Sequence, residues 1–153
     1  MDGIEGCLAC DLAAGRRELP GGRIHETEHW IVEHCVGPLG VGALLVKPRR
    51  HVVALGELRA EEAAELGPLV SRSAAVVDEL VQPEQVYVGL WSHAGRVRVH
   101  IHFVVQPATT EAIDAIGSHG PGLPAGQFAL GVLPDPAAVE AFSDRARALI
   151  ARG

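Results

Sequence analysis

The sequence has no uninterrupted apolar stretch that approaches the roughly 20 residues a membrane-spanning helix requires. Its opening, MDGIEGCLACD, has neither the basic start nor the apolar region of a secretion signal. These absences argue against a membrane-spanning or secreted protein. We therefore expect a soluble protein located in the cytoplasm.

Positive charge and cysteine are also scarce. Only 13 Lys and Arg face 19 Asp and Glu, so an extended nucleic-acid surface is not expected, although a small anionic ligand could be bound locally. Three cysteines cannot all pair within one chain. The C-x-x-C spacing of Cys7 and Cys10 suits a metal or redox site better than a structural disulfide, and Cys35 is interpreted as a buried core thiol.

The pattern of apolar residues predicts a mixture of helices and strands. With 153 residues, 48% of them hydrophobic, the chain is long enough for a single domain over residues 1–153. The predicted strands are residues 23–25, 30–35, 42–46, 85–91 and 97–105. The predicted helices are residues 11–16, residues 59–81 and a last helix that is capped by Asp135 and reaches Ala151. The second of these helices is expected to kink or restart at Gly67-Pro68. Between them, a Gly- and Pro-rich break is expected at 117–126. The fold class is α+β, an antiparallel sheet with one main helix packed on it and a C-terminal helix.

The strand predicted over residues 97–105 carries two histidines. Because side chains alternate between the faces of a strand, the odd, apolar positions face the core, whereas Arg98, His100, His102 and Val104 share the other face. His100 and His102 are then roughly 7 Å apart, which lets two imidazoles address one ligand or metal. The alternative is that they simply form a polar, solvent-facing edge.

Several landmarks surround these histidines in a specific order. They are Cys7-Leu8-Ala9-Cys10, Gly15, Leu19-Pro20, the strand 42–46, Lys47-Pro48-Arg49-Arg50-His51, Gly95, and Val104-Val105-Gln106-Pro107. With these landmarks the chain resembles the histidine triad (HIT) superfamily, whose pattern is H-x-H-x-H with hydrophobic spacers. The resemblance implies a HIT-like fold with a core at about residues 5–107 and a divergent C-terminal extension over 108–153.

The triad itself is incomplete, and two registers are open. In the first, His100 is the first triad residue, His102 the second, and Val104 replaces the third histidine. In the rival register Arg98, His100 and His102 take the three positions. Gly95 and Pro107 favour the first register.

The resemblance implies a nucleotide hydrolase or transferase. In the family, the second triad histidine attacks the α-phosphorus of a phosphoramidate or dinucleoside polyphosphate, and water then cleaves the nucleotidyl-histidine. The resemblance assigns this role to His102, with His100 as the other catalytic histidine. Since Val104 cannot contact phosphate, the substrate-binding candidates are Arg98, His93 and Gln106. A further candidate is His34, which with Cys35 stands where the family has its acidic ribose-binding residue and the hydrophobic residue after it.

Many bacterial members of the family bind zinc, and the resemblance places the ligands at Cys7, Cys10, His51 and His100. A closed set of four ligands makes the zinc structural and leaves no position for an activated water. The alternative is two free thiols and an ordinary loop histidine. Redox use of the cysteine pair is disfavoured because no thioredoxin-like context follows it.

Two other functions remain open at this point. One is a non-catalytic, zinc-stabilised nucleotide-binding protein, which Val104 favours; the other is a zinc-stabilised interaction module without a nucleotide ligand. The resemblance also implies a homodimer.

Overall fold

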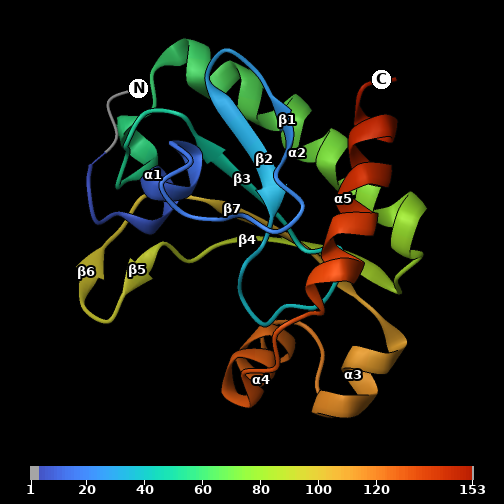
Figure 1. The fold of residues 1–153 in the computed structure, drawn as a ribbon. Coiled ribbons are helices and arrows are strands. Elements are labelled where there is room, and N and C mark those ends of the chain that lie inside the picture. The colour runs from blue at the N-terminus through green and yellow to red at the C-terminus, as the bar shows by residue number, and fades with distance from the viewer. Residues whose placement is uncertain (1–3, 153) are drawn as a thin grey trace.

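A five-stranded antiparallel sheet organises the molecule, which a computed structural model describes over residues 4–152. In spatial order its strands are β1 (Arg23–Glu26), β2 (Trp30–His34), β3 (Leu44–Pro48), β7 (Phe103–Ala108) and β4 (Gln85–Leu90), as Figure 1 shows. Sequential hairpins build one half of the sheet, and β7 inserts between β3 and β4. The segment that leads into β7 therefore enters the sheet between β3 and β4.

Two long helices cover one face of this sheet. They are α2 (Ala60–Val81) and α5 (Pro136–Ile150), and both pack on it in Figure 1. The main core lies between them and the strands, where Trp30 and Val77 are fully buried. The Trp30 indole also donates a hydrogen bond of 2.8 Å to the Glu62 carbonyl. The α+β prediction, with a main and a C-terminal helix on an antiparallel sheet, is confirmed.

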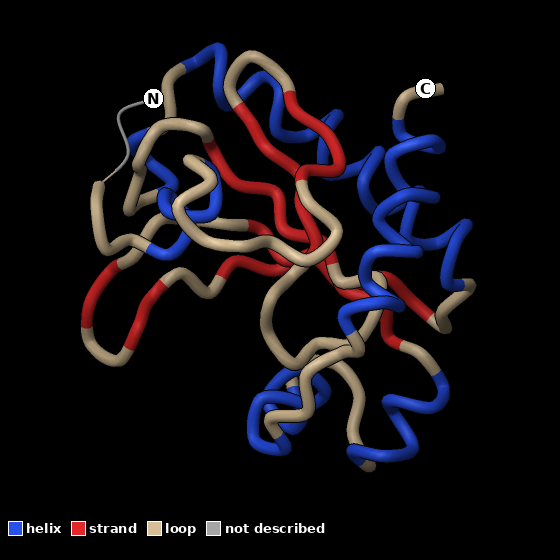
Figure 2. The backbone as a smooth tube through the Cα atoms, in the orientation of Figure 1, coloured by secondary structure: helices blue, strands red, loops and turns tan. Residues whose placement is uncertain are grey.

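Short elements and loops supply the rest of the molecule. They are α1 (Leu8–Ala13), a 3-10 turn (Leu55–Glu57), the hairpin of β5 (His93–Ala94) and β6 (Val97–Arg98), α3 (Thr110–Ile116) and α4 (Gly122–Leu130). Figure 2 shows the long loops that connect them. Within residues 4–152, no helix has both the length and the apolar character that crossing a bilayer would need.

Several predicted boundaries were wrong. The strand predicted over 97–105 is divided into β6 and β7, because residues 97–98 pair with β5 in a separate hairpin. Val97, expected in the core, is consequently 66% exposed. The first helix begins at Leu8 rather than Asp11, and α2 continues through Pro68 without a break. Helix α4 occupies part of the break expected at 117–126.

The C-terminal segment is part of the main core rather than an appendage to it. Asp135 caps α5 as predicted, accepting a hydrogen bond of 3.0 Å from the Ala138 amide. Val139, Phe142 and Ile150 are buried against the sheet and α2. Residues after 107 thus contribute to the hydrophobic core.

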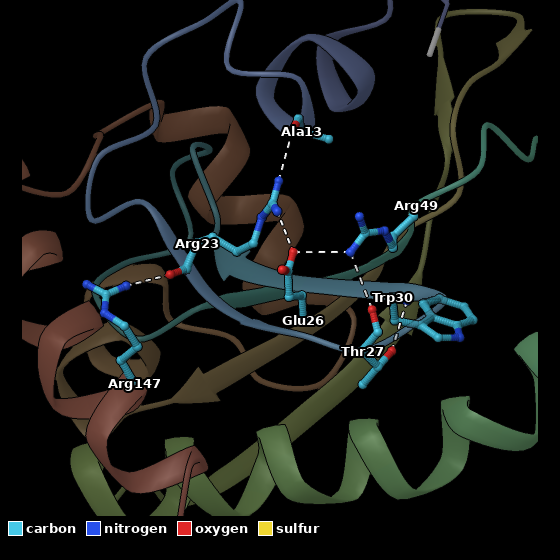
Figure 3. Close-up of polar contacts among 7 residues, drawn as sticks. All are labelled: Ala13, Arg23, Glu26, Thr27, Trp30, Arg49 and Arg147. Carbon is cyan, nitrogen blue, oxygen red and sulfur yellow. Dashed lines mark hydrogen bonds and ion pairs between the residues drawn. The ribbon is translucent and has the colours of Figure 1, made fainter. Parts of the chain in front are cut away.

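Polar contacts tie the first hairpin to the helices on either side of it. Figure 3 shows Arg23 donating to the Ala13 carbonyl at the end of α1, at 2.8 Å, and also contacting Glu26. Arg49 reaches the same carboxylate, and Arg147 of α5 donates to the Arg23 carbonyl. The hairpin is therefore connected to both α1 and α5.

A buried carboxylate fixes the start of α2. Glu62 is 2% exposed, accepts two hydrogen bonds from the Arg50 guanidinium (3.0 and 2.8 Å), and accepts a third from the Arg59 amide at 2.7 Å. The Arg50 contacts lower the Glu62 pKa from 4.5 to about 2. Because the folded-state pKa is depressed, this stabilisation is present above about pH 4.5 and is lost as the pH falls toward 2.

Glu62→Gln is expected to lower the free energy of unfolding at pH 7 by about 1–3 kcal/mol, because a charged acceptor of three hydrogen bonds is lost. The difference from wild type should shrink as the pH falls from 4.5 toward 2. Urea unfolding across this pH range measures both effects. The matched control is Glu26→Gln, whose carboxylate is 46% exposed, with an expected loss below about 1 kcal/mol. Equal losses for the two variants would contradict this assignment.

Candidate functional site

A cavity of about 650 Å³ lies on the sheet face opposite α2 and α5. Its walls come from residues 4–9 and Leu12, the loop that follows β2, the β5–β6 hairpin, the approach to β7, and Phe128 of α4. The cavity has the size of a small-molecule site, and most of its lining is apolar. Its few polar side chains therefore decide what it can bind.

Four metal-ligating side chains from three separate segments converge beside the cavity. Their ligand atoms all lie within 4.8 Å of one another, and they are Cys7, Cys10, His51 and His100. The Cys10 Sγ atom is 3.3 Å from His51 Nδ1 and 3.4 Å from His100 Nδ1, close to the roughly 3.5 Å between sulfur and nitrogen ligands of a tetrahedral zinc ion. Two thiols and two imidazoles form a donor set that suits zinc and fills all four positions.

The environment of His100 aims one particular nitrogen at this cluster. Its Nε2–H donates to the Pro48 carbonyl at 2.9 Å, which leaves Nδ1 with a lone pair toward Cys10. The ring is 1% exposed, and burial lowers its pKa to about 4, so the imidazole is neutral at pH 7. A neutral ring whose other nitrogen donates to a carbonyl is the usual arrangement of a metal-ligating histidine.

His102 is oriented differently. Its Nδ1–H donates to the His100 carbonyl at 3.1 Å, and its amide donates to Ser92 Oγ at 3.0 Å. Since a carbonyl can only accept, the neutral ring carries its proton on Nδ1 and its lone pair on Nε2. The residue lines the cavity and is half-buried. His102 therefore has the free nitrogen that a nucleophile requires, whereas both nitrogens of His100 are engaged.

The other predicted substrate-binding residues lie in different surroundings. Arg98 lines the cavity, and within residues 4–152 no carboxylate lies within ion-pair distance of it. His93 is exposed on β5, across from Arg98, and does not line the cavity. Arg98 is thus the predicted residue best placed to meet a bound anion.

Gln106 and His34 are buried outside the cavity lining. The Gln106 amide donates to the Gln127 side chain. His34 lies on the helix-covered face, donates from Nδ1 to the Cys35 carbonyl at 2.8 Å, and accepts at Nε2 from the Gly42 amide at 2.9 Å. Burial lowers the His34 pKa and keeps the ring neutral. Because neither side chain lines the cavity, neither belongs to the substrate-binding set that we propose.

Two charged residues in the cavity wall were not anticipated. Lys47 and Glu33 form an ion pair in which both side chains are almost fully buried, and Lys47 Nζ also donates to the Ala9 carbonyl of α1 at 3.0 Å. Burial raises the Glu33 pKa, and the Lys47 ammonium opposes that shift. The sequence feature that could have identified them is a single charged residue within each of two largely apolar strands, Glu33 in β2 and Lys47 in β3. The pair attaches α1, and with it Cys10, to the sheet.

Cys35 and Phe128 also form part of the cavity wall. Cys35 is buried, as predicted for a core thiol, but it also lines the cavity, as does Val104. Phe128 comes from α4, in a segment where the sequence carries no functional motif. Nothing in its sequence neighbourhood could have placed it at the site.

Comparisons with known proteins identify the architecture. No protein-family model matches the chain. A zinc-bound histidine triad family protein from Mycobacterium smegmatis matches with 22% identity over 96% of this chain and 94% of that one, at a TM-score of 0.67. A hypothetical histidine triad nucleotide-binding protein from Sulfolobus tokodaii matches with 19% identity over 95% and 93%, at a TM-score of 0.71.

A third structure extends the same comparison. A Hit-like protein involved in cell-cycle regulation from Bartonella henselae matches with 17% identity over 95% of this chain and 98% of that one, at a TM-score of 0.71. The protein is therefore an α+β chain with a cavity and a cysteine and histidine cluster on one face of its sheet. Its fold is that of the histidine triad superfamily, which confirms at the level of the fold the resemblance drawn from the sequence.

Lys47→Met is expected to lower the free energy of unfolding by about 3–5 kcal/mol, because Glu33 must then hold an unpaired charge or take up a proton in a buried position. The double variant Glu33→Leu with Lys47→Met should recover most of that loss. Urea unfolding at pH 7 with matched metal content measures the free energy of unfolding of the single and the double variant. Additive losses in the double variant would show that the two side chains do not act as a pair.

Proposed function

We propose that this protein is a nucleotide hydrolase or transferase of the histidine triad type that acts on a nucleoside phosphate derivative, either a phosphoramidate or a dinucleoside polyphosphate. The observation that carries the proposal is the hydrogen bond from His102 Nδ1 to the His100 carbonyl, which leaves Nε2 as the unprotonated nitrogen in the cavity. The fold shared with histidine triad proteins, one of which is described as nucleotide-binding, supports it.

In the proposed reaction, the His102 Nε2 lone pair forms a P–N bond with the α-phosphorus while the bond from phosphorus to the leaving group breaks. The leaving group departs with the electron pair of that bond and takes up a proton. Water then adds to the phosphorus, the P–N bond breaks, and the nucleoside monophosphate is released with His102 restored. Arg98, which lines the cavity, supplies positive charge toward the phosphate oxygens.

The same observation favours one of the two triad registers. A nucleophile needs a free ring nitrogen. His100 has none, since its Nε2 donates to Pro48 and its Nδ1 faces Cys10. We therefore propose His102 as the second triad residue and as the nucleophile, with Val104 in the third position. Because a valine in that position leaves the triad incomplete, a non-catalytic nucleotide-binding protein remains the second candidate function.

We propose that Cys7, Cys10, His51 and His100 hold a structural zinc ion. Burial raises the Cys10 pKa, and a bound cation would hold that sulfur as the thiolate. The ion would link α1 to the loop after β3 and to the segment before β7, and it would supply no water for the reaction because all four positions are filled. Residues 4–9, which form one wall of the cavity, would thereby be fixed.

His102→Ala is expected to lower turnover of adenosine phosphoramidate and diadenosine triphosphate by more than about a thousandfold, because no other nucleophile replaces the imidazole. His119→Ala, at an exposed histidine outside the cavity, is the control and should retain activity. Activity is measured at matched zinc content.

Three other outcomes would redirect the assignment. Turnover that survives His102→Ala but not His100→Ala favours the rival register. No turnover by the intact protein, combined with a rise in its thermal midpoint on adding AMP, favours the nucleotide-binding candidate. Neither turnover nor a thermal shift favours an interaction module.

Metal analysis of the purified protein is expected to find one zinc ion per chain. Cys10→Ser should lose the ion and lower stability by more than the about 1 kcal/mol typical of a single substitution, since the energy of metal binding contributes to folding. Cys35→Ser is the matched control because Cys35 lies outside the cluster, and it should keep the ion. Equal zinc content in the two variants would rule out this ligand set.

A further inference from the structure

One group of side chains in the cavity wall is uncharged. They are Cys35, Val36, Leu39, Leu45, Val104 and Phe128, and together we call them the apolar subsite. Cys35, Leu39 and Val104 are buried in one hydrophobic cluster, against which Leu45 packs. His102 and Val104 both line the cavity, so the subsite lies in the same cavity as the proposed nucleophile.

This subsite offers little to a ligand that carries hydroxyl groups. The Cys35 thiol already accepts a hydrogen bond from the Gly37 amide at 3.3 Å, and burial raises its pKa, so it stays uncharged. The nearest carboxylate in its strand, Glu33, is engaged by Lys47, and His34 lies on the opposite face. A sugar placed here would lose hydrogen bonds to water without replacement by these side chains.

Phe128 gives the subsite an aromatic wall on an anchored helix. Its side chain is 57% exposed although it borders the cavity. A Cβ atom at Gly37 would lie 3.6 Å from the ring, so the ring approaches the loop that holds Cys35. Helix α4 is tied to the sheet by the contact of Gln127 with Gln106. The ring is therefore presented to the cavity by a fixed element.

The cavity lining combines two kinds of chemistry. Arg98 and His102 suit an anion, whereas the subsite suits an apolar group. We infer that the apolar subsite binds an aryl or alkyl substituent of the substrate, so that the substrate is a phosphate compound with an apolar group beside the reacting phosphorus. This inference rests on the proposed function for the identity of the reacting group. It adds Phe128 as a residue that determines specificity.

The first test measures binding without turnover. Calorimetry with the zinc-loaded full chain compares 1-naphthylmethylphosphonate with methylphosphonate, and the naphthyl compound is expected to bind at least about tenfold more tightly. Phe128→Ala should remove most of this difference and leave methylphosphonate binding unchanged. Leu130→Ala is the matched control, because Leu130 is also exposed on α4 but does not line the cavity.

Phe128→Leu distinguishes loss of apolar contact from a disturbed helix, since it should retain most of the preference for the naphthyl compound. Equal affinity of the two phosphonates for the intact protein would overturn the inference. So would an equal effect of Phe128→Ala and Leu130→Ala.

A second test separates this inference from the proposed function. It compares turnover of adenosine phosphoramidate with that of its N-benzyl derivative, which is expected to have about tenfold higher kcat/KM in the intact protein and not in Phe128→Ala. A naphthyl preference in binding without turnover of either compound refutes the proposed function and supports the subsite. Turnover that depends on His102 but shows no benzyl preference refutes the subsite and supports the proposed function.

Discussion

The hydrogen bond from His100 Nε2 to the Pro48 carbonyl organises the site, because it assigns different tasks to two histidines that are only two residues apart. It turns the lone pair of His100 toward Cys10, and the His100 carbonyl in turn takes the Nδ1 proton of His102. One imidazole thereby faces the cysteines and the other faces the cavity. Pro48 can accept this hydrogen bond because β3, which ends at Pro48, is the neighbour of β7 in the sheet, and His100 lies in the segment that leads into β7.

The two faces of the sheet meet opposite requirements. One face is an apolar core under α2 and α5, where burial stabilises the fold. The other face carries the cluster, the cavity and the buried Lys47–Glu33 pair. A buried ion pair is weak support for stability, since desolvation offsets most of its attraction. Its contact with Ala9 instead fixes where α1 lies, which decides the position of both the cluster and one cavity wall.

Two of the positions where this chain departs from the pattern of the histidine triad family lie together in space. Val104, which we propose for the third triad position, and Cys35 both line the apolar subsite with Phe128. His34, which stands at the place of the family's acidic sugar-binding residue, lies on the opposite face of the sheet. The subsite therefore carries neither an imidazole nor a carboxylate at these positions.

The sequence by itself predicted the α+β class and most of the helices and strands, because these follow from local periodicity. The four residues of the cluster were implied by the resemblance to the histidine triad superfamily. The sequence could not show that His34 points away from the cavity, that residues 99–102 leave the strand ladder, or that Phe128 reaches the site. Those outcomes depend on the pairing of distant strands and on the packing of α4, which bring together residues far apart in the sequence. Side-chain direction and tautomer are set by such long-range contacts, and only the tertiary structure supplies them.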